Sequence, residues 1–301
     1  MGNHNHHHHG HHHTTKNIKT AFFLNLVFTI IEIIGGFYTN SLAIMSDAVH
    51  DLGDSLSLGM SWYFQKLSNK QATKKYSYGY GRFSLLGAII NSIVLIVGSF
   101  FIISEAIPRI INPEEANATG MMWLAILGII VNGAAVLKLK KGSSINERVV
   151  SLHLLEDVLG WVAVLIASIV MMYWDVPILD PILSLAIAGY VLFNVYRNIK
   201  DAFKIILQGV PNEISSDKIK EQILLNIDEV EDIHDCHIWT LDGEFHIATI
   251  HIILKNKEFS WQSSKEVKEK IKKLLHDNFH LEHVTLELES NLEDCGYKNC
   301  N

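Results

Sequence analysis

The run FSLLGAIINSIVLIVGSFFIISEAI, residues 83–107, carries no charged side chain before Glu105. A helix on the surface of a soluble protein keeps a polar face, whereas a transmembrane helix needs about 20 consecutive, mostly apolar residues. This run therefore predicts a membrane-spanning helix and argues against a large soluble helical core. Similar apolar runs predict six spans in total, at residues 18–38, 42–64, 83–107, 121–138, 149–173 and 178–197.

Charges in the loops predict the orientation of these spans, because Lys and Arg concentrate on the cytoplasmic side of a membrane. Basic residues lie between spans two and three, and between spans four and five, at Lys66, Lys70, Lys74, Lys75, Arg82, Lys138, Lys140, Lys141 and Arg148. On the other side, Arg109 lies among acidic residues, namely Glu114, Glu115, Asp175 and Asp180. We therefore expect both termini in the cytoplasm. The compact loops favour a bacterial plasma membrane over a eukaryotic organelle.

Composition divides the chain of 301 residues into four expected parts. Residues 1–17 are expected to form a disordered, His-rich cytoplasmic tail, and residues 18–208 a six-helix transmembrane transport domain. Residues 209–290 are expected to form a cytoplasmic domain, and residues 291–301 a tail containing Cys295 and Cys300. The first thirteen residues hold eight histidines, and such tracts bind metals loosely. This tract is therefore either a collector of metal or a dispensable tail.

Two of the spans carry ionisable residues where lipid would surround the helix, at a cost of roughly 2.5–3.5 kcal/mol for each charge near the bilayer centre. HLLED, residues 153–157, places His153 and Asp157 four residues apart, and the second span repeats this spacing with His50 and Asp54. Residues i and i+4 lie on the same face of a helix. Each of the two helices therefore offers one imidazole and one carboxylate side by side.

If the two faces meet, two imidazoles and two carboxylates converge in a set that suits tetrahedral Zn²⁺. Two carboxylates balance the charge of the dication, and metal binding releases protons from its ligands, so the site would exchange Zn²⁺ for H⁺. The alternative interpretation of one such pair is a hydrogen bond that links neighbouring helices. Asp47 lies on nearly the same face and could orient a ligand or admit the metal. Ligand type does not separate Zn²⁺ from Co²⁺, Cd²⁺ or Fe²⁺.

Other polar residues in the spans have simpler expected roles. Glu32 and Asn25 of the first span are expected to line the cavity or to link helices. Asp51 and Glu156 point away from the paired His and Asp residues, so we expect them to face water or neighbouring helices.

Several motifs resemble those of the cation diffusion facilitator family. They are MSDAVHDLGDS (45–55), YSYGYGR (76–82), HLLED (153–157), DPILS (180–184) and HDCHIWTL (234–241). The resemblance implies that His50, Asp54, His153 and Asp157 hold the transported metal, in a homodimer that exports Zn²⁺ in exchange for protons. His50 resembles the more zinc-selective branches. The loop QKLSNKQATKKYSYGYGR (65–82) lacks the His, Asp and Glu of some members, so we expect no metal site in it.

The chain after Ile214 reads as a soluble α+β domain in the order αββαβ, and the resemblance implies a ferredoxin-like fold. Helices are expected at 215–227 and 262–278, and strands at 235–243, 245–255 and 283–289, with a turn at Asp242-Gly243. The resemblance places cytoplasmic zinc ligands at His234, His251 and Glu289, where zinc would be sensed and the dimer tightened. His237, His283 and Glu287 are nearby in sequence or register. The simpler interpretation of a strand histidine is a half-exposed side chain.

Three functions fit these features, and a proton-coupled metal antiporter fits them best. A zinc-dependent intramembrane hydrolase would need an open metal position and usually an HExxH motif, which the sequence lacks. A metal-gated channel or sensor would bind metal in its tail and tolerate loss of the membrane His and Asp residues. The net charge of −7 indicates no nucleic-acid partner, and cytoplasmic cysteines are expected to stay reduced. Whether K⁺ assists the protons is open.

Overall fold

The computed structural model describes residues 11–68, 72–139, 145–255 and 260–290. They belong to two compact units. One unit is helical and contains the chain up to Leu67 and from Leu86 to Ile199. The other contains the segment from Ser68 to Leu85 together with the chain from Lys200 onwards. The expected N-terminal histidine tract up to residue 10, and Cys295 and Cys300, lie outside the described residues.

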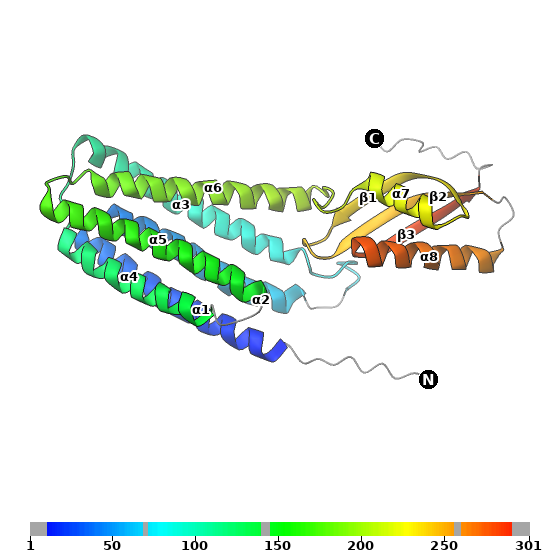
Figure 1. The fold of residues 1–301 in the computed structure, drawn as a ribbon, viewed down its shortest axis with the longest axis horizontal. Helices are drawn as coiled ribbons and strands as arrows, with labels where there is room; N and C mark the ends of the chain where they lie inside the picture. The colour runs from blue at the N-terminus through cyan, green and yellow to red at the C-terminus, as the bar shows by residue number, and fades with distance from the viewer. Residues whose placement is uncertain (1–10, 69–71, 140–144, 256–259, 291–301) are drawn as a thin grey trace. The chain divides into compact units, whose positions relative to one another are not determined.

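The first six helices run alongside one another as a bundle (Figure 1). They are α1 (His11–Thr39), α2 (Leu42–Ser68), α3 (Phe83–Ile111), α4 (Ala118–Leu139), α5 (Ile145–Tyr173) and α6 (Leu179–Ile206). Within the described residues, α3, α4, α5 and α6 each contain a stretch long and apolar enough to cross a membrane. The apolar stretch of α1 is shorter, Asn25–Thr39, and α2 carries three aspartates in its central turns. All six expected spans correspond to helices.

The helix ends differ from the expected spans, for example at the start of α1. This helix begins at His11, inside the stretch assigned to the disordered tail at residues 1–17. Starting a helix is the costly step, whereas adding a residue to an existing helix costs little. A helix formed by the apolar residues can therefore continue backwards through polar ones, a continuation that hydrophobic periodicity does not reveal.

Two groups of buried apolar side chains hold the helices of the bundle together. The first joins α1, α4, α5 and the start of α2, through Phe28, Ala43, Ile44, Met121, Ala125, Trp161 and Val164. The second joins Leu95 of α3 to Val191 and Val195 of α6. Helices α4 and α5 approach so closely that a Cβ atom on Gly128 would lie 2.3 Å from the Trp161 ring. Glycine at this position therefore sets the packing distance between the two helices.

Asp180, at the start of α6, is hydrogen-bonded to the first turn of α2. Its Oδ1 accepts from Ser41 Oγ at 2.6 Å and from the Ala43 N–H at 3.2 Å, and its Oδ2 accepts from the Leu42 N–H at 2.7 Å. The first N–H groups of a helix have no partner within that helix. Asp180 is only 2% exposed, so it acts as a buried cap for α2 and not as one of the exposed charges near the span ends.

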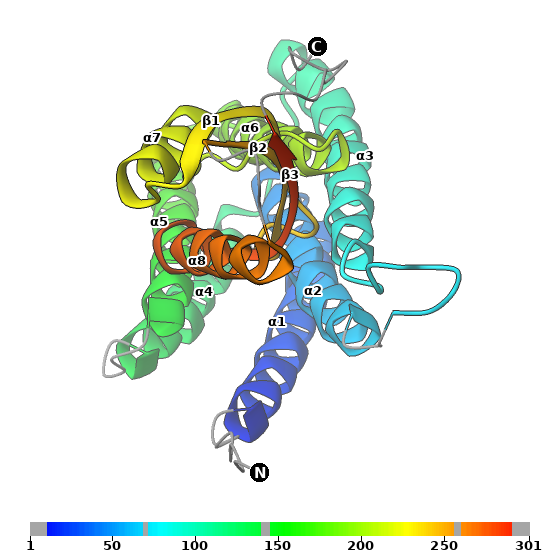
Figure 2. The same cartoon turned by 90° about the vertical axis from the view of Figure 1, so that its right-hand side faces the viewer.

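The second unit contains a three-stranded sheet with two helices on one face (Figures 1 and 2). Its elements are α7 (Ser216–Asn226), β1 (Val230–Thr240), β2 (His246–Leu254), α8 (Trp261–Phe279) and β3 (Leu281–Ser290). Strand β2 lies in the centre, antiparallel to β1 and parallel to β3. Because parallel strands need a crossover connection, α8 lies between β2 and β3 in the chain. The order αββαβ is as predicted.

The buried face of α7 is narrow. Ile219, Ile223 and the following Ile227 are buried in the core of the unit. Leu224 is 37% exposed, because it lies about 100° around the helix from its neighbour Ile223. Ser215 occupies the N-cap position, but its side chain makes no capping hydrogen bond.

Two ion pairs link the helices of this unit to β1 and to the residue that precedes it. Lys220 of α7 binds Asp232 at 2.7 Å, and Lys270 of α8 binds Glu229 at 2.7 Å. The hydrogen bond from Lys220 lowers the pKa of Asp232, and the one from Lys270 lowers the pKa of Glu229. A lowered carboxylate pKa stabilises the fold above the ordinary pKa, and this contribution disappears as the pH falls through the lowered value. Both pairs are exposed, so their contribution is small.

Candidate metal centre

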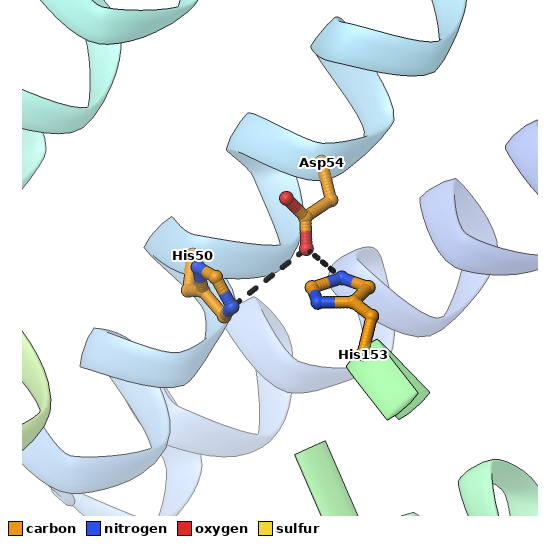
Figure 3. A group of neighbouring side chains, drawn as sticks. All are labelled: His50, Asp54 and His153. Carbon is orange, nitrogen blue, oxygen red and sulfur yellow. Dashed lines mark hydrogen bonds and ion pairs between the residues drawn. The ribbon is translucent and has the colours of Figure 1, made fainter. Parts of the chain in front are cut away.

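His50, Asp54 and His153 come together between α2 and α5 (Figure 3). His153 Nε2 lies 2.8 Å from Asp54 Oδ2, within hydrogen-bonding distance, and His50 Nε2 lies 3.7 Å from the same oxygen. One potential ligand atom from each of the three residues lies within 4.8 Å of the other two. The spacing of four residues within α2 places His50 and Asp54 on the face that meets α5.

Asp157, the fourth residue predicted from the sequence, lies next to this group but is not among the three residues whose ligand atoms all lie within 4.8 Å of one another. Its Oδ1 lies 3.9 Å from His50 Nε2, and its side chain is 10% exposed, against 40% for His153. The His153–Asp54 hydrogen bond is also what a purely structural link between helices would provide. A structural link needs only one such pair, however, whereas here two imidazoles and two carboxylates converge from both helices.

Further acidic side chains lie around this group on the inner side of the bundle. Asp47 and Asp51 of α2 are 7% and 4% exposed, so Asp51 does not face water. Asn25 of α1 donates to the Asp51 backbone carbonyl at 3.0 Å and lies 3.1 Å from Ser55 Oγ, which links α1 to α2 as predicted. Glu156 is exposed and accepts a hydrogen bond from Tyr190 of α6 at 3.0 Å.

A second group of potential ligands lies on the sheet of the other unit. His234 and His251 face each other across β1 and β2, with ring centroids 5.2 Å apart. Glu289 of β3 bridges them, with Oε2 at 2.9 Å from His234 Nε2 and Oε1 at 2.6 Å from His251 Nδ1. These three residues also satisfy the distance requirement for a shared ion. Glu289 is buried, which is unusual for a glutamate and requires such partners.

The sequence pattern of the cation efflux transmembrane domain matches residues 18–207. That of the cytoplasmic domain of cation efflux proteins matches residues 211–291. The chain belongs to the cation efflux family. It is therefore an integral membrane protein that exports metal cations, and not an enzyme.

Relatives of this cation efflux protein match along nearly its whole length. The cadmium, cobalt and zinc/H⁺-K⁺ antiporter of Bacillus velezensis is 34% identical, over 96% of this chain and 91% of its own. The zinc transporter ZitB of Pectobacterium atrosepticum is 30% identical, over 99% of this chain and 91% of its own. The metal cation efflux system protein CzcD of Cupriavidus metallidurans is 31% identical, over 91% of this chain and 86% of its own.

The cytoplasmic group of the cation efflux protein includes an acidic residue that sequence reasoning missed. Asp235 Oδ2 lies 3.4 Å from His251 Nε2, at an irregularity in β1 that shifts the register between His234 and His237. Asp235 has a φ of +47°, and an irregularity of this kind re-aims side chains. Strict strand alternation places Asp235 on the opposite face from His234, so the pattern gave no signal for it. An aspartate tolerates positive φ better than most residues, which is the one available clue.

Of the other nearby residues named from the sequence, one lies at the edge of this group and two make other contacts. Glu287 Oε2 lies 3.4 Å from His251 Nε2, at the edge of the group. His237 instead pairs with Asp235 at 3.0 Å. The ring of His283 packs edge-on against Tyr78, with centroids 5.9 Å apart.

Proposed function

We propose that the chain is a proton-coupled antiporter that exports Zn²⁺ from the cytoplasm. The observation that carries this proposal is the close approach of His50, Asp54 and His153 from two membrane helices, with Asp157 beside His50. Two imidazoles and two carboxylates suit a tetrahedral Zn²⁺ ion. The transported ion is the substrate of this site.

The charges of the proposed ligands explain why protons would be the counter-ion. With Zn²⁺ bound, two carboxylates neutralise the dication. Without it, two negative charges remain in a region of low polarity, which is unfavourable unless protons replace the metal. The contact between His153 Nε2 and Asp54 Oδ2 at 2.8 Å leaves room for one such proton between the two groups. Metal and protons therefore compete for the same atoms.

The names of the relatives support both the choice of metal and its exchange for protons. One relative is named as a zinc/H⁺-K⁺ antiporter that also takes cadmium and cobalt, and another as a zinc transporter. We infer that the chain handles Zn²⁺ first among divalent metals, since two of its four proposed ligands are imidazoles, which suit zinc. A metal-gated channel is the second candidate, and it predicts metal flux that does not respond to a pH gradient.

The mechanism that we propose is alternating access around α2 and α5. His153 is the most exposed of the four ligand side chains and Asp157 the least, so metal first meets His153 and finishes at Asp157. The bundle then opens to the other side. Protons arriving there bind the carboxylates and imidazoles and displace the metal.

We further infer a homodimer in a bacterial plasma membrane with both termini in the cytoplasm. The basic loops around Lys74 and Lys138 support this orientation. The match to the cytoplasmic domain of cation efflux proteins supports dimer formation, and the relatives compared are bacterial.

Reconstitution of the purified protein into liposomes tests the proposed function. A pH gradient is imposed, the divalent metal is varied among Zn²⁺, Co²⁺, Cd²⁺ and Fe²⁺, and dyes report metal and proton movement together. We expect Zn²⁺ and protons to move in opposite directions, with Zn²⁺ flux increasing with the gradient. Metal flux without proton movement, and indifferent to the gradient, would support the channel instead.

We also propose that His234, His251 and Glu289 bind regulatory zinc in the cytoplasmic unit. Replacing Glu289 by Ala removes a proposed ligand that bridges the two histidines, so we expect zinc affinity at this site to fall by at least ~100-fold, more than the loss of a group that only orients ligands. Titration calorimetry of the full-length protein measures it, with the exposed Glu282→Ala as the matched control on the same strand. If zinc binding is the same in both variants, the cytoplasmic site is not formed by these residues.

A further inference from the structure

Glu32 of α1 is a buried carboxylate that no positive charge compensates among the described residues, and its side chain lies beside the Asp51 carboxyl. The residue is 1% exposed. Neither Oε1 nor Oε2 has a hydrogen-bond partner among the described residues. Burying an ionised carboxylate in such a place is strongly unfavourable unless it is paired. Burying the protonated, neutral form costs far less.

The ionisable groups around Glu32 are acidic. Its electrostatic neighbours are Asp51 and Asp47 of α2, and Asp157 of α5. Helix α4 also packs against α1, and its residues from Ala118 to Leu137 include no ionisable side chain. Among the described residues, these neighbours supply no positive charge to offset an ionised Glu32, so they favour its neutral form.

We propose that Glu32 binds a proton that is exchanged for the transported metal, at a position separate from the metal ligands. This inference rests on the proposed function, because it names a group that couples metal to protons. The ligand is a proton bound to one carboxylate oxygen of Glu32. The two faces of α2 then differ in function. One face carries the proposed metal ligands His50 and Asp54, and the other carries Asp51 towards α1 and the proton site at Glu32.

Zinc and the Glu32 proton are coupled through the electric field between them. When the dication binds, its charge offsets the carboxylates near Glu32, so the proton is held less tightly and leaves. When the metal leaves, its positive charge no longer offsets the acidic groups near Glu32, so Glu32 binds its proton again. The zinc ion and the proton interact electrostatically through the partly buried interior of the bundle, where screening by salt is weak. They therefore do not need to be in direct contact.

A proton fits this position better than a monovalent metal ion does. A metal ion needs several oxygen ligands arranged around it, whereas a proton needs a single oxygen. The amide of Asn25, on the same helix, is already hydrogen-bonded to the Asp51 backbone and lies beside Ser55. It is therefore committed to the contact between α1 and α2.

The test compares Glu32→Gln with the wild-type protein in two kinds of zinc flux. Net zinc uptake driven by a pH gradient requires Glu32 to release its proton and bind another in each transport cycle. Exchange of labelled for unlabelled zinc does not require this. With a glutamine, the position holds a permanently neutral group of the same shape. We expect net uptake to fall ~tenfold or more, with zinc–zinc exchange retained, and calorimetry to show about one proton fewer released for each Zn²⁺ bound.

Two further variants keep the result interpretable. Glu32→Asp keeps a titratable group and is expected to restore proton release and net uptake at least in part. Glu105→Gln removes an exposed glutamate of α3 and is expected to behave as wild type.

Three results would overturn the proposal. The first is proton release and net uptake in Glu32→Gln equal to those of the wild type. The second is loss of zinc binding in both Glu32→Gln and Glu32→Asp, which would make Glu32 a metal ligand or a structural residue. The third is zinc uptake in the wild type that follows a K⁺ gradient at constant pH and disappears in Glu32→Gln. Failure of the proposed function is distinguishable, because the wild-type protein would then show no zinc–proton exchange.

Discussion

Replacing either Asp54 or Asp157 by alanine is expected to abolish zinc transport while the protein still inserts and dimerises. Each substitution removes one of two carboxylates that would balance the charge of Zn²⁺. It also removes an acidic neighbour of an imidazole, namely Asp54 at 2.8 Å from His153 or Asp157 at 3.9 Å from His50. Groups that only orient metal ligands change affinity by about 10–100-fold, so loss of a ligand should reduce flux by at least ~100-fold.

Zinc uptake into vesicles under a pH gradient measures this effect, and gel filtration of the purified variants reports assembly. Glu156→Ala is the matched control, because Glu156 is exposed, adjacent to Asp157 in the chain, and bonded only to Tyr190 among the described residues. Its flux should stay close to that of the wild type. Near-normal proton-driven uptake by either aspartate variant would refute the assignment of the metal site.

Replacing Asp180 by alanine is expected to destabilise the bundle more than any change on its lipid-facing surface. The carboxylate accepts hydrogen bonds from Ser41, Leu42 and Ala43 in a buried position. Each buried donor left without a partner costs about 1–3 kcal/mol, and loss of a helix cap typically costs about 1 kcal/mol. Since the Ser41 hydroxyl can rotate to another acceptor, we expect a total loss of roughly 2–5 kcal/mol.

Thermal unfolding in detergent measures this loss. Asp180→Asn keeps one carboxylate-like oxygen as an acceptor, so its melting temperature should lie between those of Asp180→Ala and the wild type. Asp201→Ala is the control, because Asp201 is an exposed aspartate of the same helix and should have little effect. Equal melting temperatures for Asp180→Ala and Asp201→Ala would show that the cap of α2 contributes nothing.

The difference between these two sites illustrates what local sequence can and cannot reveal. His50 and Asp54 are one helical turn apart, as are His153 and Asp157, so their common face follows from helix geometry alone. The role of Asp180 depends on residues more than a hundred positions earlier in the chain. No periodicity within α6 indicates that contact. An acidic residue near the end of a span is also expected simply because it lies close to water.

The cytoplasmic unit shows the same division. The alternation in β1 and β2 and the stripe of α8, with Val267, Ile271 and Leu275 buried, are local patterns and predicted the order αββαβ. The irregularity in β1 that turns Asp235 towards His251 breaks such a pattern. A prediction that assumes strict alternation of side chains along a strand cannot locate a residue, such as Asp235, at which the alternation is broken.

The amino-acid sequence by itself determined the helical spans, the order of the cytoplasmic elements and the two His–Asp pairs. Each of these follows from the residues of one short segment and the fixed repeat of a helix or strand. Only the tertiary structure decided that the two pairs meet, that Asp180 caps α2 and that Glu32 is buried beside Asp51. These contacts depend on how each helix is rotated and packed against segments distant in the chain, and the period of a single helix contains no information about that rotation.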